Sequence, residues 1–273
     1  MKQQPIGIFD SGYGGLTVLK EIKAKLPAYD YLYLGDNSRS PYGNRSFETV
    51  YEYTLQCVKW FFKQGCSLVI LACNTASAKA LRSIQQNDLA KIDPAKRVLG
   101  VIRPTTEIIG NFTKTGNIGI LATNGTVVSE SYPIEIKKFF PGIHVFQQAC
   151  PMWVPLIENN EYDNTGADYF IKKYITELMQ QSPDIDTVLL GCTHYPLLID
   201  KIKNTLPPTV TVVSQGEIVA NSLAIYLQNH PQIDEKCSKN RQISFYTTDS
   251  TEDFDNHAAI FYGSVIKSSH LSL

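Results

Sequence analysis

The sequence predicts an α/β fold built from mainly parallel sheets flanked by helices. Short apolar runs alternate along the chain with segments whose apolar residues repeat every three or four positions, the pattern of successive β-α-β units. Several runs, such as SLVILA at 67–72, are continuously apolar, which is typical of parallel strands covered on both faces. Ligands of such folds bind beyond the carboxyl ends of the strands.

The expected strands are short and follow one another through most of the chain. They are residues 5–9, 29–34, 67–72, 97–102, 117–122, 144–149, 186–191, 209–213 and 242–247. The segments 16–26 and 167–179 each place their apolar residues on one helical face, so we expect amphipathic helices there. Residues 49–62 also have a helical pattern.

Composition and charge exclude several classes of protein. The chain has 273 residues, of which 43% are hydrophobic, enough for one large domain or two lobes. Its 25 basic and 26 acidic residues form no basic cluster, so nucleic acid and anionic membranes are not expected partners. The N-terminus lacks the apolar core of a signal peptide, and no run approaches the roughly 18 residues of a membrane span. We therefore expect a cytoplasmic protein with reduced thiols.

Two of the six cysteines stand in matching surroundings. LVILACNTASA at 68–78 resembles TVLLGCTHYPL at 187–197, so Cys73 and Cys192 each follow an apolar strand and precede an expected helix start. Both thiols should lie at the functional edge of a sheet, as should Asp10 and Asp36. A helix N-terminus favours thiolate, which predicts a lowered pKa for such a thiol. Isolated cysteines elsewhere are expected to be structural.

The segment DSGYGG at 10–15 follows the first strand and has two interpretations. Gly12 and Gly14 match part of a dinucleotide fingerprint, and Asp36 stands where a ribose-binding acid would be, but Thr17 occupies the third glycine position. Asp10 and Ser11 ahead of the glycines favour a small polar substrate instead. Further hydroxyl and amide groups follow other strands, in SPYG at 40–43 and ATNGT at 122–126.

His194, two residues after Cys192, leaves three roles open. One histidine and one cysteine do not make a zinc site, which needs three or four ligands, so no metal is expected. A Cys–His hydrolase with His194 as base is an alternative, but it leaves Cys73 unexplained. A neutral capping residue is the third interpretation. Glu158, in PLIENNE, is a candidate to orient the imidazole.

Taken in order, the motifs closely resemble those of the glutamate racemases, in the aspartate/glutamate racemase superfamily. The resemblance runs nearly end to end and is carried by GIFDSGYGGLTVL, YLGDNSRSPYG, LACNTASA, ILATNGT, CPMWVPLIE and GCTHYPLL. It implies cofactor-independent 1,1-proton transfer, in which one thiolate removes the α-proton of glutamate and the other thiol reprotonates the opposite face. Met152 and Trp153 are bulkier than the family pattern at their positions, which indicates packing rather than chemistry.

The resemblance also assigns roles to residues. Cys73 would act on D-glutamate and Cys192 on L-glutamate, with Asp10 and His194 assisting, Glu158 behind His194, and Asp36 near Asp10. The substrate would be bound by residues that follow several strands. These are Asp10, Ser11, Pro41, Tyr42, Gly43, Asn74, Thr75, Thr123, Thr126, Thr193 and His194.

The architecture that the resemblance implies is two similar α/β lobes with the active site in the cleft between them. Lobe one would be residues 1–98 plus 210–273, with Asp10 and Cys73. Lobe two would be residues 99–209, with Thr123, Cys192 and His194. We expect a closed, dry cleft, a homodimer, and a role in supplying D-glutamate for peptidoglycan.

The sequence leaves other functions open. An aspartate or hydantoin racemase would share the scaffold and differ in the residues that bind the side chain. A regulatory protein on the same fold, for example one that binds a topoisomerase, would be suspected if either cysteine were missing, and both are present.

Overall fold

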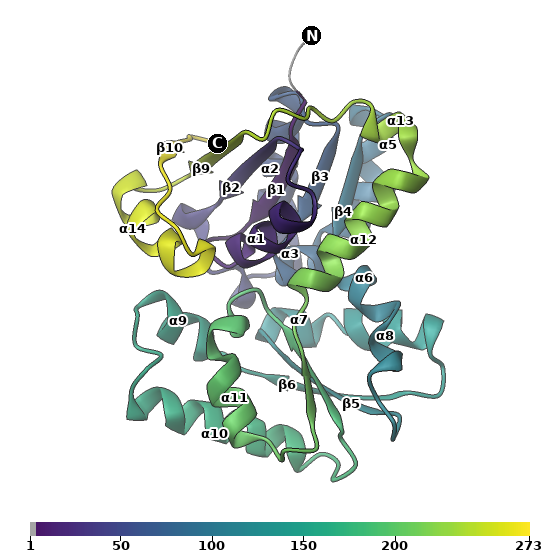
Figure 1. Ribbon diagram of the computed structural model, residues 1–273, viewed down its shortest axis with the longest axis vertical. Helices are drawn as coiled ribbons and strands as arrows, with labels where there is room; N and C mark the ends of the chain where they lie inside the picture. Colours follow the sequence, from purple (N-terminus) through teal and green to yellow (C-terminus); the bar gives the residue numbers. More distant parts are fainter. Residues whose placement is uncertain (1–3) are drawn as a thin grey trace.

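A computed structural model describes residues 4–273 as two α/β lobes (Figure 1). The first sheet has six strands in the order β10-β9-β2-β1-β3-β4, and the second has four in the order β6-β5-β7-β8. Every strand pair is parallel. The strands are β1 (Ile6–Asp10), β2 (Tyr31–Gly35), β3 (Leu68–Leu71), β4 (Arg97–Gly100), β5 (Asn117–Ala122), β6 (His144–Ala149), β7 (Thr187–Gly191), β8 (Thr211–Val213), β9 (Ile243–Thr247) and β10 (Ser268–His270).

Helices flank both sheets, as the alternating pattern predicts. In the first lobe, α1 and α12 pack against each other, and the C-terminal α14 packs against α1 beside the N-terminal strands (Figure 1). The helices are α1 (Gly15–Lys25), α2 (Phe47–Lys63), α3 (Asn74–Lys79), α4 (Leu81–Ser83), α5 (Leu89–Ile92), α6 (Ile102–Thr106), α7 (Asn124–Val128), α8 (Ser131–Phe139), α9 (Trp153–Glu158), α10 (Thr165–Met179), α11 (Ile199–Thr205), α12 (Gly216–Asn229), α13 (Pro231–Asp234) and α14 (Thr251–Tyr262). Within residues 4–273, no helix combines the length and the apolar character that crossing a bilayer requires.

All nine expected strands are present, within a few residues of their expected bounds. The central strands β1, β2, β3 and β7 are buried along their whole length, which explains their continuously apolar sequences. The sequence prediction missed β10, because this short edge strand reads Ser-Ser-His and has no apolar pattern. It pairs with β9 alone.

The expected lobe boundaries are shifted from the observed ones. A boundary at 98/99 would cut β4, whose four residues all pair with β3 in the first sheet. A boundary at 209/210 would put β8 in lobe one, whereas β8 pairs with β7 in the second sheet. The chain therefore crosses between the lobes just after Gly100 and just after Val213, because strand pairing, which the sequence does not display, decides where each lobe ends.

The carboxyl ends of strands from both sheets carry polar residues. Asp10 ends β1, and Cys73 follows β3 in the first lobe; Thr123 follows β5, and Cys192 follows β7 in the second. The interior behind these ends is apolar and fully buried on β1, β3, β5 and β7. The packed strands thus fix the positions of the polar residues at their ends.

Asp186, just before β7, predicts an acid-sensitive step in the stability of the second lobe. Its carboxylate accepts hydrogen bonds from the hydroxyl of Thr113 (2.6 Å) and the backbone N–H groups of Lys114 (2.7 Å) and Thr115 (2.9 Å). Burial alone would raise the pKa of Asp186, but these bonds lower it to about 2. Because the folded-state pKa lies below the unfolded value, the carboxylate stabilises the fold above about pH 4, and this contribution is lost as the pH falls toward 2.

We expect Asp186→Asn to lower the free energy of unfolding by about 1–2 kcal/mol at pH 7, a value reduced for partial exposure. The difference from wild type should shrink between pH 4 and pH 2. Thermal unfolding as a function of pH measures it, with the exposed Asp184→Asn as the control. A destabilisation that stays constant down to pH 2 would contradict the assigned pKa.

Candidate active site

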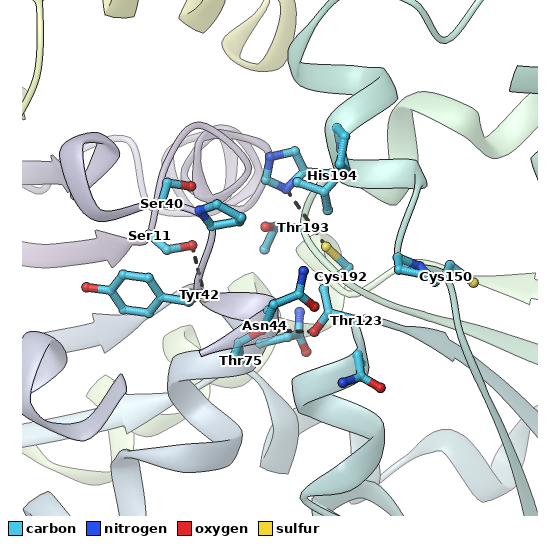
Figure 2. Close-up of a pocket in the computed structure, with 18 of the residues that line it drawn as sticks. Ser11, Ser40, Tyr42, Asn44, Thr75, Thr123, Cys150, Cys192, Thr193 and His194 are labelled. Carbon is cyan, nitrogen blue, oxygen red and sulfur yellow. Dashed lines mark hydrogen bonds between the residues drawn. The ribbon is translucent and has the colours of Figure 1, made fainter. Parts of the chain in front are cut away.

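A cavity of about 50 Å³ lies between the lobes and contains both candidate thiols. Its walls come from the strand ends of both lobes and from two connecting segments. The lining residues are Ser11, Ser40, Pro41, Tyr42, Gly43, Asn44, Cys73, Asn74, Thr75, Thr123, Asn124, Cys150, Pro151, Val154, Pro155, Glu158, Cys192, Thr193 and His194. Figure 2 shows this convergence of side chains from the two lobes.

Cys73 is the N-cap of the short helix α3. Its Sγ accepts a hydrogen bond from the backbone N–H of Ala76 (3.4 Å) and lies 3.4 Å from the Oγ of Ser11. Burial, and then the charge of Asp10, raise the pKa of the Cys73 thiol to about 12. The lowered pKa expected from the helix N-terminus is therefore wrong, because a six-residue helix does not offset burial beside a carboxylate. Cys73 rests as a neutral thiol.

Cys192 has a different partner. Its Sγ lies 3.8 Å from His194 Nδ1 (Figure 2). His194 Nε2 in turn lies 2.9 Å from Glu158 Oε1. Burial lowers the pKa of His194, but the contacts with Cys192 and Glu158 outweigh it and raise the pKa to about 10. His194 is thus an imidazolium at neutral pH, and its ring lies against the sulfur of Cys192.

Asp10 lies beneath the loop that begins α1. Its Oδ1 accepts a hydrogen bond from the backbone N–H of Gly12 (2.9 Å), so the glycine segment holds a carboxylate of the protein itself. Its Oδ2 is buried and has no hydrogen-bond partner among residues 4–273. Burial raises the pKa of Asp10, despite the nearby charge of His194. A carboxyl group with a raised pKa beside Cys73 is suited to exchange a proton with that thiol.

Three expected site residues, Asp10, Asp36 and Thr126, do not line the cavity. Asp10 lies behind the lining residue Cys73. Asp36 is fully buried and accepts hydrogen bonds from Arg39 Nε (2.7 Å), Thr248 Oγ1 (2.9 Å) and the hydroxyl of Tyr42. It therefore anchors the loop that carries Tyr42, while its backbone N–H donates to the carbonyl of Asp10 (3.0 Å). Thr126 is buried behind the lining residue Thr123, with 3.1 Å between the hydroxyls.

The structure brings most of the other expected residues together. Ser11, Pro41, Tyr42, Gly43, Asn74, Thr75, Thr123, Thr193, His194 and Glu158 all line the cavity. Thr75 and Thr123 meet across the two lobes, with 3.0 Å between their hydroxyls. Trp153 is fully buried and packs edge-on against Tyr195, so this departure from the family pattern belongs to the core of lobe two.

The sequence prediction missed several lining residues. These are Ser40, Asn44, Asn124, Cys150, Pro151, Val154 and Pro155. Cys150 and Pro151 open the motif CPMWVPLIE, so that motif could have pointed to this wall. The four residues of this wall from Cys150 to Pro155 contribute mainly apolar surface. No group of three or more histidine, cysteine, aspartate or glutamate residues in the described part of the chain is arranged to hold a metal ion.

Two thiols thus face one cavity from opposite lobes, with an imidazolium beside one of them, an arrangement of groups that can exchange protons with a bound molecule. A family model described as Asp/Glu/Hydantoin racemase matches residues 6–223. A glutamate racemase from Persephonella marina is 38% identical over 269 residues, covering 98% of this chain and 97% of the relative. One from Ruegeria sp. is 42% identical over 238 residues, covering 84% of this chain and 87% of the relative. The chain belongs to the Asp/Glu/hydantoin racemase family and is an amino-acid racemase.

Solved structures give the same result for the fold. A glutamate racemase isoform from Bacillus anthracis superposes with a TM-score of 0.90 and 34% identity, covering 100% of this chain and 99% of that one. A Francisella tularensis glutamate racemase, solved in complex with D-glutamate, superposes with a TM-score of 0.88 and 30% identity, covering 100% and 98%. The expected two-lobe α/β fold is confirmed.

Proposed function

We propose that this protein interconverts L- and D-glutamate by two-thiol 1,1-proton transfer. The observation that carries the proposal is the placement of Cys73 and Cys192 in one cavity, at the ends of corresponding strands of opposite lobes. A single base would return the proton to the face it came from, whereas two thiols can serve both faces of a planar carbanion. Glutamate as substrate is supported by the names of the relatives and by the D-glutamate complex of the Francisella tularensis protein.

In the L-to-D direction, Cys192 is the base. Its thiolate, paired with the His194 imidazolium, takes the α-proton of L-glutamate and becomes a thiol, and the electron pair of the broken C–H bond stays on Cα. The Cys73 thiol then gives its proton to the opposite face, which forms D-glutamate and leaves a Cys73 thiolate. The raised pKa of Cys73 suits this acid role, since its proton is in place at neutral pH.

The reverse direction needs a Cys73 thiolate and a Cys192 thiol. The imidazolium of His194, next to Cys192 Sγ, can supply the proton of that thiol. Asp10 can take the proton from Cys73, because its free Oδ2 is buried near the thiol and its pKa is raised. On the other side, Glu158 holds the imidazolium that stabilises the Cys192 thiolate. We propose these positioning and proton-exchange roles for Asp10, His194 and Glu158. Asp36 acts one step further away, through the loop that carries Tyr42.

Apart from the imidazolium of His194, the proposed donors to the substrate are neutral groups. The lining residues of the cavity in the described chain include neither lysine nor arginine. Carboxylates would therefore be bound by hydroxyl, amide and backbone N–H groups, which stabilise negative charge strongly where water is excluded. The proposed binding residues are Ser11, Pro41, Tyr42, Gly43, Asn74, Thr75, Thr123, Thr193 and His194. Thr126 supports Thr123, and Asp10 acts from behind the lining, next to Cys73.

The cellular role follows from the activity. We propose that the protein acts in the cytoplasm as a homodimer, without a cofactor, and supplies D-glutamate for peptidoglycan synthesis, in keeping with the bacterial glutamate racemases that it resembles.

Glu158→Gln is expected to change the alkaline limit of activity. Removing this carboxylate removes a contact that raises the pKa of His194, so the pKa should fall from about 10. Activity that depends on the imidazolium should then decline at a lower pH than in wild type, by about one unit. The pH dependence of kcat/KM measures this. An unchanged alkaline limb would show that Glu158 does not control His194.

The function itself is tested with wild-type protein and D-glutamate in heavy water. Loss of optical activity accompanied by deuterium at Cα is the expected result. The same assay with L- and D-aspartate and with a hydantoin tests the alternative substrates. Absence of racemisation and exchange with either enantiomer of glutamate would overturn the proposal.

A further inference from the structure

A closed ring of three buried hydrogen bonds lies behind the cavity. It is next to the two crossover segments, where the chain passes between the lobes after Gly100 and after Val213. Asn74 Nδ2 donates to Gln215 Oε1 (2.8 Å), Gln215 Nε2 donates to the hydroxyl of Tyr132 (2.7 Å), and the Tyr132 hydroxyl donates to Asn74 Oδ1 (2.6 Å). All three residues are at least 96% buried, and each one both donates and accepts within the ring. Asn74 also lines the cavity, next to Cys73.

The orientation of the ring is set by a backbone group. Gln215 Nε2 also faces the carbonyl oxygen of Val101 (3.2 Å) and Thr105 Oγ1 (3.0 Å). A carbonyl oxygen can only accept, so the NH2 end of Gln215 must face Val101 and its Oε1 must face Asn74. That placement requires Asn74 to present Nδ2 to Gln215 and Oδ1 to Tyr132.

The ring also joins three parts of the chain. Asn74 begins α3 in the first lobe, Tyr132 belongs to α8 in the second, and Gln215 precedes α12 where the chain returns to the first lobe. Val101 lies at the other crossing. The two crossover segments therefore meet on one glutamine, which holds an amide of the cavity wall.

We infer that Tyr132 and Gln215 are positioning residues that fix the carboxamide of Asn74 so that an Nδ2–H is available to a carboxylate of the substrate. One hydrogen of Nδ2 is used by Gln215, and the other has no partner among residues 4–273. A flipped amide would turn the acceptor Oδ1 toward that position and repel a carboxylate. The inference rests on the proposed function, because it concerns how that site binds its substrate.

Tyr132→Phe tests the inference with the smallest change of shape. It removes the only donor that Asn74 Oδ1 has in the described structure, while Gln215 keeps Thr105 and Val101. We expect the KM for glutamate to rise about tenfold and kcat to change less than threefold, the pattern of lost binding common to ground and transition states. Tyr31→Phe is the matched control, since that buried hydroxyl donates to the carbonyl of Leu26 away from the cavity.

A double-mutant cycle separates positioning from general packing. If Tyr132 acts through Asn74, Tyr132→Phe in an Asn74→Ala background should leave KM within twofold of Asn74→Ala alone. Independent, multiplying effects on KM would overturn the inference, as would a Tyr132→Phe protein with wild-type KM, or a loss equal to that of Tyr31→Phe. Wild-type racemisation is measured first. Its absence would be a failure of the proposed function, distinct from any of these results.

Discussion

Replacing Cys73 or Cys192 by serine is expected to lower glutamate racemisation by about 10³-fold or more, since each thiol is one of two proton-transfer groups. Each variant should nevertheless still exchange the α-proton of one enantiomer of glutamate. Cys73→Ser retains the Cys192–His194 pair, so it should exchange the α-proton of L-glutamate for solvent deuterium without inversion. Cys192→Ser retains Cys73 and should exchange only D-glutamate.

The deuterium-exchange assay is decisive, because steady-state racemisation rates cannot distinguish a defect at Cys73 from a defect at Cys192. The enantiomers have equal free energy, so kcat/KM must fall by the same factor in both directions for any variant. Deuterium incorporation, followed by NMR with each pure enantiomer, does separate them. In Cys192→Ser the exchange should also accelerate with rising pH, because the pKa of Cys73 is about 12 and its thiolate fraction grows about tenfold per pH unit below that value.

Cys237→Ser provides a matched control. This buried cysteine donates to the carbonyl of Ile233 in the first lobe, and a serine hydroxyl can make the same bond. Its racemisation should stay within about twofold of wild type. Full racemisation by Cys73→Ser would indicate that one thiol is sufficient, and exchange of both enantiomers by either variant would contradict the two-base assignment.

The sequence predicts those features of the fold and the site that depend on neighbouring residues alone. The buried strands β1, β3, β5 and β7 are visible as apolar runs, and the residues that follow them are then placed at the sheet edge by the fold class alone. Cys73 and Cys192 can be paired in this way from their matching sequence surroundings. The strand β10 cannot be found by the same reasoning, because its three residues are polar and its pairing with β9 is set by the path of the chain.

The orientation and the protonation state of the site residues depend instead on contacts between segments that are distant in the sequence. Asp36 directly follows β2, yet Thr248 and Arg39 bind its carboxylate away from the cavity. The thiol of Cys73 occupies a helix N-cap, which by itself predicts a lowered pKa, but burial and Asp10 reverse the direction. Local sequence identifies a candidate group, and only the tertiary surroundings decide its charge and the direction it faces.

Gly14→Ala is expected to lower kcat/KM for glutamate by about 10²-fold, the cost typical of displacing a catalytic group by about 1 Å. A Cβ at Gly14 would lie 2.2 Å from Thr193 Oγ1 and 2.4 Å from His194 Nδ1. Both atoms belong to the opposite lobe. Thr17, in the helix α1 that follows Gly14, fixes the segment of Thr193 and His194 by donating a hydrogen bond to the carbonyl of Thr193 (3.0 Å). Either His194 must leave Cys192 or the lobes must move apart.

Backbone strain does not contribute to this effect, because Gly14 has φ −57° and ψ −36°, a conformation that alanine adopts readily. The loss of activity should also be larger for the Cys192–His194 pair than for Cys73. Deuterium exchange into L-glutamate, which needs the Cys192–His194 pair, should decrease more than exchange into D-glutamate, which needs Cys73. Gly142→Ala, where the added methyl meets nothing within 4 Å, should match wild type in both assays. If exchange into L-glutamate and exchange into D-glutamate decrease equally, with the melting temperature unchanged, the two lobes move apart as rigid units. If kcat/KM stays within threefold of wild type, the catalytic role of His194 does not depend on its position against α1.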